Sequence, residues 1–244
     1  MGPLARLEAA VRSLIYDPTQ VIGRNRGFSE CLVCGHHGRF WSFGNPPRRN
    51  AQCPRCGAKE RHRLMALWMR GLPEPLFAGK RVLHVAPDPG ERALVEDAAE
   101  YTTADLDRTD VDLKLDLTAT GLEGGAYDII LCSHVLEHID DDHAAMREIH
   151  RLLAPGGVVI LMVPYLAGLA ETYEDPTITD LRGRHRHFGQ KDHVRLYGRD
   201  YVDRLAAAGF EVETFAAASA DCVRYGLVPG EPLFAAWKNR QSGD

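Results

Sequence analysis

The chain has 244 residues, of which 45% are hydrophobic and 26% charged, an ordinary composition for a folded globular protein. Its formal net charge of −5 argues against the broad basic surface that proteins living on nucleic acid usually carry. No apolar run approaches the ~20 residues that span a bilayer, and residues 1–10 lack the apolar core of a secretory signal. We therefore expect a cytoplasmic protein without a membrane partner.

Two CxxC pairs, each followed by glycine, come first along the chain: Cys31-Leu-Val-Cys34-Gly and Cys53-Pro-Arg-Cys56-Gly. Paired knuckles of this kind supply four thiolates for a closed tetrahedral Zn²⁺ site, so the pattern predicts a zinc ribbon with a structural ion. Two disulfides are the competing interpretation, but they need an oxidising compartment. A redox CxxC is a weaker alternative, because that chemistry needs only one pair.

The ribbon region is basic, with aromatic residues interleaved. The residues concerned are Arg39, Arg48, Arg49, Arg55, Lys59, Arg61, His62 and Arg63, with Phe40, Trp41 and Phe43. Such a surface is typical of nucleic-acid binding, but it equally suits an anionic substrate or contacts to acids of the neighbouring domain. Residues 58–70 form an amphipathic pattern that predicts a helix packing the ribbon against the rest of the protein, and residues 71–75 are the best linker candidate.

Residues 81–164 alternate between short apolar runs and helix-like segments. The runs Val82–Ala86, Tyr101–Ala104, Ile129–Cys132 and Val158–Val163 predict buried strands, and Glu91–Glu100 and Asp141–Leu153 predict helices. This alternation favours a parallel sheet covered on both faces, with a ligand at the carboxyl ends of the strands. Farther on, Asp200 is a candidate N-cap, and Phe210–Phe215 with Leu233–Trp237 predict an antiparallel pair.

The segments RVLHVAPDPG, YDIILCSHVLEHI and LLAPGGVVILMVP together resemble the class I S-adenosylmethionine (SAM)-dependent methyltransferases. That resemblance implies an α/β, Rossmann-like, doubly wound and mostly parallel sheet with a C-terminal antiparallel hairpin. The family usually has a Gly-x-Gly-x-Gly turn after its first strand, of which only Gly90 is present here. Pro87 and Pro89 remove two amide donors that a dinucleotide pyrophosphate would need but that SAM does not.

The resemblance also implies where SAM, and the product S-adenosylhomocysteine, would bind. Asp105 corresponds to the acid that accepts hydrogen bonds from both ribose hydroxyls, with Asp107 as the alternative, and Asp116 to the position that meets the adenine amino group. The complete set of expected cofactor residues is His84, Ala86, Pro87, Gly90, Asp105, Leu106, Asp116, Leu117, Ser133 and His134.

The polar stretch 165–199 follows the last parallel strand, where insertions lie over the methyl group in the family, and part of it resembles a subset of bacterial methyltransferases. We expect His193 to act as a general base, oriented by Asp192 or Asp200, with His138 as the second candidate. A metal cluster of His185, His187, Asp192 and His193 is an alternative without a recognised ligand spacing.

These observations predict two parts: residues 1–72, comprising an N-terminal helix, the zinc ribbon and a connecting helix, and residues 73–244, the methyltransferase domain. The favoured activity is O-methylation of a small-molecule, glycan or peptide-linked acceptor. The alternatives are an RNA or protein methyltransferase whose ribbon presents the substrate, and a non-catalytic binding module of the same fold.

Overall fold

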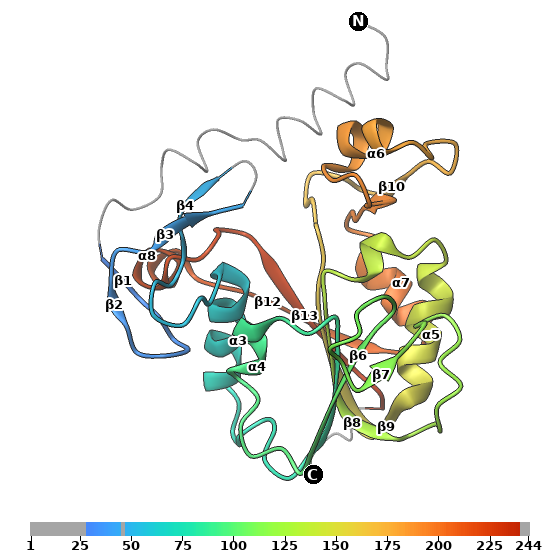
Figure 1. Ribbon diagram of the computed structural model, residues 1–244, viewed down its shortest axis with the longest axis horizontal. Helices are drawn as coiled ribbons and strands as arrows, with labels where there is room; N and C mark the ends of the chain where they lie inside the picture. Colours follow the sequence, from blue (N-terminus) through green and yellow to red (C-terminus); the bar gives the residue numbers. More distant parts are fainter. Residues whose placement is uncertain (1–27, 45–46, 240–244) are drawn as a thin grey trace, which may run out of the picture.

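A seven-stranded sheet forms the centre of the computed structural model, which describes residues 28–44 and 47–239 (Figure 1). The strand order is β12-β13-β9-β8-β5-β6-β7. The strands are β5 (Arg81–Val85), β6 (Glu100–Asp105), β7 (Leu113–Lys114), β8 (Tyr127–Ser133), β9 (Leu153–Met162), β12 (Glu211–Ala216) and β13 (Pro232–Trp237). Strands β5 to β9 pair in parallel, whereas β13 is antiparallel to both β9 and β12. The predicted fold class is confirmed.

The sheet reverses its strand order between β5 and β8, because β6 lies on one side of β5 and β8 on the other. The central strands are apolar on both faces: Leu83, Ile130 and Ile160 are fully buried. Continuous apolar runs of this kind suit strands covered by helices on both sides. The carboxyl ends of β5 and β8 are therefore the point where a ligand is expected in such a fold.

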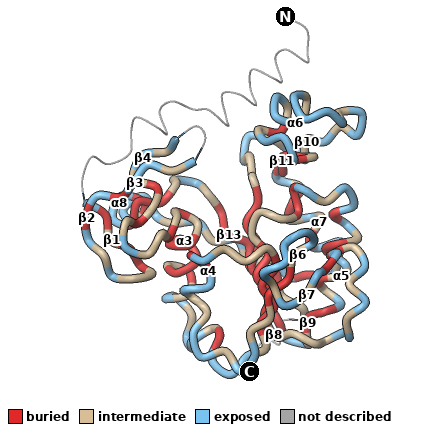
Figure 2. The backbone as a smooth tube through the Cα atoms, in the orientation of Figure 1, coloured by how far each residue is buried: buried red, intermediate tan, exposed pale blue. Residues whose placement is uncertain are grey.

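Helices cover both faces of the sheet (Figure 1). On one face, α5 (Asp142–Leu152) and α7 (Tyr201–Ala207) bury residues such as Met146, Ile149 and Leu205. On the other, α3 (Glu60–Arg70) and α8 (Ser219–Tyr225) contribute a second apolar cluster. Figure 2 shows the buried residues gathered along the strands and α3. None of the helices in the described part of the chain has the length and apolar character that crossing a bilayer requires.

The prediction of a helix over Glu91–Glu100 is wrong. Helix α4 has only four residues, Pro89–Arg92, and the chain continues as turns to β6. The reason lies in α3, whose Leu64 and Trp68 pack on the same sheet face, so a full crossover helix is not needed to cover it. Leu94 and Val95 still pack against this cluster from the turns.

Four short strands make up the ribbon: β1 (Ser29–Glu30), β2 (His37–Gly38), β3 (Trp41–Phe43) and β4 (Arg48–Gln52). They form two separate antiparallel pairs, β1 with β2 and β3 with β4. The predicted connecting helix is confirmed as α3, which contacts both the ribbon and the sheet. The predicted N-terminal helix lies outside the described residues, and the division after residue 72 stays a prediction.

Arg63 on α3 joins the ribbon to the sheet. Its fully buried guanidinium donates five hydrogen bonds of 2.7–3.0 Å to four backbone carbonyls. Ala51 and Ala58 supply two of them from the ribbon side, and Tyr225 and Gly226 supply the others from the end of α8. A planar guanidinium has the five donors that such an arrangement requires.

Residues between β9 and α7 form a small lobe beyond one end of the sheet (Figure 1). It contains β10 (Tyr173–Glu174), α6 (Leu181–Phe188) and β11 (Arg195–Leu196), with Phe188 and Leu196 buried in its own apolar cluster. Asp200 precedes α7 as predicted, but its side chain makes no cap bond. It accepts hydrogen bonds from Thr172 and Arg204 instead.

We expect Arg63→Ala to lower the free energy of unfolding by about 3 kcal/mol or more, because it leaves buried carbonyls without donors. Arg63→Lys should recover little, since an ammonium group cannot reach all four acceptors. Urea unfolding followed by fluorescence measures the effect. Arg224→Ala, which removes an exposed arginine paired with Glu30, is the control and should leave the midpoint nearly unchanged. An Arg63→Ala midpoint equal to that of the control would contradict this role.

Candidate active site at the strand ends

The backbone adopts left-handed conformations at the carboxyl ends of β5 and β8. Ala86 has φ 49° and His134 has φ 56°, both unusual for residues other than glycine. Each is held by a backbone hydrogen bond to a neighbouring strand, from Ala86 to Ala104 and from His134 to Met162. Backbone strain of this kind gathers at functional sites, and here it marks the switch point of the sheet.

The turn after β5 is tied to the first turn of α3. Asp88 pairs with Lys59 Nζ at 2.7 Å and with Arg61 at 2.8 Å, and it also accepts from the Gly90 amide. Burial opposes ionisation of Asp88, but its cationic neighbours and the amide outweigh this and hold its pKa below the usual range. The ribbon side of the chain therefore fixes the turn expected to face the cofactor.

Gly90 is required by packing as well. A Cβ at this position would lie 2.0 Å from Nδ1 of His62, so only glycine fits beneath that ring. The predicted contact of Gly90 with a cofactor stays a prediction. The sequence analysis missed the contribution of Lys59, Arg61 and His62 to this turn, although their cluster at the start of α3 was a visible signal.

His84 lies fully buried within the sheet rather than at its edge. One ring nitrogen is 2.8 Å from the hydroxyl of Tyr101 and the other 2.9 Å from Glu91 Oε2. Glu91 is also buried, and its second oxygen has no hydrogen-bond partner. Both ring nitrogens of His84 are thus hydrogen-bonded to protein groups. Through its contact with Glu91, the ring supports α4. Its predicted cofactor contact is not tested by this geometry.

Asp105 ends β6 and organises the loop that follows. Its Oδ1 accepts the amides of Asp107 and Arg108, and Arg108 in turn donates to the Pro87 carbonyl at 2.8 Å. This links the loops after β6 and β5 at one edge of the sheet. Leu106, next to Asp105, is a large apolar side chain left 55% exposed.

The remaining predicted cofactor positions have contrasting surroundings. Asp116 is exposed, and its carboxylate accepts hydrogen bonds from the amide and hydroxyl of Thr118. Leu117 is buried in the apolar cluster under α5. Ser133 and His134 end β8 and lie beside the turn of η1 (Leu136–His138).

Glu137, His138 and His193 converge on the side of this edge where the acceptor is expected. One potential ligand atom from each lies within 4.8 Å of the others. The rings of His138 and His193 are 4.7 Å apart in an edge-to-face arrangement, and Glu137 is fully buried with Oε1 3.1 Å from His134 Nδ1. Burial lowers the pKa of His193 from its ordinary value, which favours the neutral ring.

Arg195 fixes this convergence by joining β11 to the loop after β8. Its buried guanidinium donates to the carbonyls of Leu136, Ile139 and Asp140. The Val194 amide donates to the Glu137 carbonyl at 2.9 Å in the same contact. The Arg195 side chain and a main-chain hydrogen bond therefore hold together residues that are far apart in sequence.

The predicted orientation of His193 by Asp192 or Asp200 is wrong. Nδ1 of His193 lies 3.2 Å from the Phe188 carbonyl, whereas Asp192 lies beside His138, its carbonyl 3.2 Å and its carboxylate 3.6 Å from Nδ1 of that ring. Asp200 is engaged with Thr172 and Arg204. The orienting groups are main-chain carbonyls because the loop folds back on the ring.

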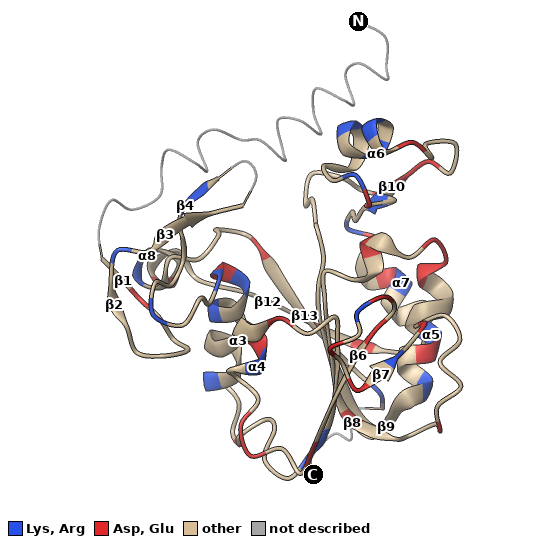
Figure 3. Ribbon diagram, viewed as in Figure 1, with Lys and Arg blue, Asp and Glu red and all other residues tan. Residues whose placement is uncertain are grey.

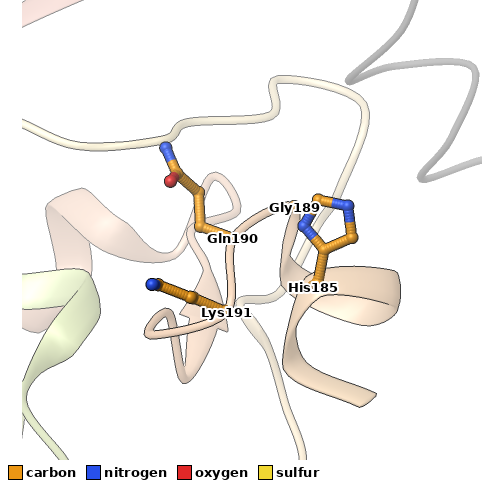
Figure 4. Close-up of a pocket in the computed structure, with 4 residues that line it drawn as sticks. All are labelled: His185, Gly189, Gln190 and Lys191. Atoms are coloured by element: carbon orange, nitrogen blue, oxygen red, sulfur yellow. The ribbon is translucent and has the colours of Figure 1, made fainter. Parts of the chain in front are cut away.

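The predicted metal cluster of His185, His187, Asp192 and His193 is not formed either. His187 is 2.6 Å from the Tyr173 hydroxyl, and His185 lines an open pocket of about 270 Å³ with Gly189, Gln190 and Lys191 (Figure 4). Within residues 28–44 and 47–239, His193 groups with Glu137 and His138 instead. His185 and His187 belong to α6, whereas His193 follows that helix.

The four ribbon cysteines do converge. Cys31 and Cys56 sulfurs are 3.6 Å apart, and those of Cys34 and Cys53 are 3.7 Å apart. All are free thiols, so the disulfide alternative is not what the structure shows. Tetrahedral Zn–S bonds of about 2.3 Å place sulfurs roughly 3.8 Å apart, which fits these separations.

Comparison with known proteins agrees with the fold. A family model described as a methyltransferase domain matches residues 58–214. A chain from the complex of the Haloferax volcanii Trm112 methyltransferase activator with a methyltransferase is 18% identical, with a TM-score of 0.52, and the match covers 73% of this chain and 90% of that one. An S-adenosylmethionine dependent methyltransferase from Mesorhizobium loti is also 18% identical, with a TM-score of 0.49 and coverage of 72% and 97%.

Among curated proteins, an uncharacterized 37.1 kDa protein in transposon TN4556 of Streptomyces fradiae is 32% identical over 118 residues. The match covers 48% of this chain and 33% of that protein, so the chain spans about a third of the length of this relative.

His62 makes stability depend on pH. Its Nδ1 accepts the Lys59 amide, and burial together with the charge of Arg61 lowers its pKa from 6.5 to about 4. Because the unfolded chain binds this proton more readily, stability should be complete above pH 6.5 and fall by about 3 kcal/mol as the pH drops toward 4. Thermal melts across this range measure the loss, and His62→Asn, which keeps an acceptor for the amide, should show a smaller one. Equal losses in both proteins would contradict this assignment.

Proposed function

The chain belongs to the methyltransferase-domain family, and on this premise we propose that it transfers the methyl group of SAM to a hydroxyl of an acceptor bound beside Glu137, His138 and His193. The proposal rests on one observation: two sets of residues lie at the same edge of the sheet, where the parallel strands end. The end of β6 carries Asp105, and the turn after β8 carries Glu137 and His138 beside His193.

The groups at this edge of the sheet are suited to binding SAM. Asp105 uses Oδ1 for its own loop, and no hydrogen bond within the described residues engages its Oδ2, so this oxygen can accept ribose hydroxyls. The exposed Leu106 beside it offers an apolar face to adenine. Pro87 and Pro89 lack amide donors, which a sulfonium cofactor without phosphates does not need. When bound, SAM supplies an electrophilic methyl group.

The chain's own contribution to the reaction is position and proton transfer. Methyl transfer needs the acceptor oxygen in line with the sulfonium, which is mainly a matter of orientation. Nδ1 of His138 faces the Asp192 carbonyl, so the Nε2 atom of that ring is the one available to take the proton of an acceptor hydroxyl. Nε2 of His193 is available in the same way.

The charge of the neighbouring lobe supports the acceptor class that we propose. Figure 3 shows basic residues gathered on α6, which carries Arg182, Arg184 and Arg186. A small hydroxylated molecule, glycan or peptide-linked group with negative charge would suit this lobe. We therefore place the acceptor between α6 and the end of β8.

A second candidate function is methylation of RNA. The ribbon exposes Phe28 by 63% and Trp41 by 59%, and exposed aromatics beside arginines are suited to stacking on unpaired bases. Salt-dependent RNA binding by the full chain would favour it, and it would be lost on Trp41→Ala. If neither SAM nor S-adenosylhomocysteine binds, a non-catalytic module becomes the better account.

Asp105→Ala is expected to weaken binding of S-adenosylhomocysteine by about 10-fold or more, because it removes a charged acceptor worth roughly 1.5–3 kcal/mol. Calorimetric titration measures the affinity. Asp105→Asn keeps the oxygen that caps the loop and should fall between Ala and wild type. Asp107→Asn, at an exposed neighbouring carboxylate, is the control. A larger loss at Asp107 would move the ribose contact to that residue.

We also propose that the four ribbon cysteines hold a structural Zn²⁺. Cys53→Ser should weaken the thiolate-to-metal charge-transfer band of the Co²⁺-substituted protein and lower its melting temperature, because only three thiolates remain and they bind the metal less tightly. Cys222→Ser, at a buried cysteine outside the ribbon, is the control and should retain the band. An unchanged band in Cys53→Ser would refute the assignment.

A further inference from the structure

The hydrogen bonds of two histidines place a ring N–H on the Nδ1 atom of each. Nδ1 of His193 is 3.2 Å from the Phe188 carbonyl, and Nδ1 of His138 is 3.2 Å from the Asp192 carbonyl. A carbonyl oxygen only accepts, so in each neutral ring the proton resides on Nδ1. Nε2 of both rings then carries a lone pair.

The lone pair on Nε2 of His193 lies near a further acceptor. Nε2 of His193 is 4.0 Å from Glu137 Oε1, which already accepts from His134, and Oε2 of Glu137 is buried without a hydrogen-bond partner. Glu137 itself is fully buried. Acceptors facing one another in a buried place are unfavourable unless a positive charge lies between them.

We propose that Glu137, His138 and His193 bind a divalent transition-metal ion through the carboxylate and the two Nε2 atoms. Metal bonds of about 2.0–2.2 Å place ligand atoms roughly 3–4 Å apart in such a site. One potential ligand atom from each of the three residues lies within 4.8 Å of the others, and Nε2 of His193 is 4.0 Å from the carboxylate of Glu137. Two imidazoles and one carboxylate suit Zn²⁺, Mn²⁺, Co²⁺ or Fe²⁺ better than Ca²⁺.

The surroundings have the features of a prepared metal site. In each histidine the Nδ1–H group donates to a main-chain carbonyl, the arrangement that fixes the orientation of metal-bound imidazoles. His134 bonds to the carboxylate of Glu137, and the Val194 amide bonds to its carbonyl. Arg195 holds the surrounding loop. Three protein ligands leave coordination positions open.

The open coordination positions would allow the metal to bind the acceptor hydroxyl, a role that rests on the proposed function. An acceptor hydroxyl bound to the ion would lose its proton to water at neutral pH, as metal-bound water does. The new O–C bond would then form as the S–C bond of SAM breaks, and S-adenosylhomocysteine would leave with the electron pair on sulfur. In this arrangement the histidines act as ligands, and the ion takes the place of a direct base.

Titration with Mn²⁺ followed by electron paramagnetic resonance tests the site in the full chain with its ribbon loaded with zinc. Mn²⁺ prefers oxygen and nitrogen donors to thiolates, so it reports on this cluster. We expect one saturable ion per chain and an affinity lowered at least about 10-fold in His138→Ala. His143→Ala, at an exposed histidine on α5, is the matched control and should bind as wild type.

His138 is about one third exposed, so its truncation should not unfold the protein, and circular dichroism of the variant checks this. Glu137→Gln is a second variant, and we expect it to lower the affinity for Mn²⁺ in the same way. Absence of saturable Mn²⁺ binding, or equal affinity in His138→Ala and His143→Ala, would overturn the metal site. A parallel titration with S-adenosylhomocysteine separates the proposals: cofactor binding without Mn²⁺ binding contradicts the metal alone, and Mn²⁺ binding without cofactor binding supports the site while contradicting the methyltransferase role.

Discussion

The buried guanidinium of Arg63 is the interaction on which the arrangement of the two parts depends. It satisfies carbonyls of the ribbon at Ala51 and Ala58 and carbonyls at the end of α8, and it also lies over the ring of Phe40. A buried charge is costly unless its donors are all used, so the ribbon, α3 and α8 can take only the relative position in which all five bonds form. This constraint sets where the first turn of α3 lies.

That first turn reaches the edge of the sheet. Lys59 and Arg61 neutralise Asp88 in the turn after β5, and the ring of His62 fills the space above Gly90. The ribbon is thus mechanically continuous with the loop that faces the expected cofactor. The stability of the ribbon and the shape of that loop therefore depend on the same contacts. On the other side of the edge, Arg195 has the corresponding role for the loop that carries Glu137 and His138.

The sequence was sufficient to predict features that depend on local pattern. Apolar runs located the strands around Leu83 and Ile130, and the helical pattern over Asp141–Leu153 located α5, because such patterns act over a few residues. The long helix predicted after Gly90 failed because α3 covers its place, a contact between distant segments. Arg63 looked like part of a basic surface and is buried. The meeting of Glu137 with His193 could not be predicted, since it follows from the way residues 165–199 fold back.

The central claim is that SAM binds across the carboxyl ends of β5, β6 and β8, with its sulfur toward Glu137 and His138. A crystal structure of the zinc-loaded protein with S-adenosylhomocysteine tests it most directly. The account predicts ribose hydroxyls on Asp105, adenine against Leu106, and the sulfur on the side of the histidines. Ligand bound elsewhere, or a ribose that contacts neither Asp105 nor Asp107, would contradict it.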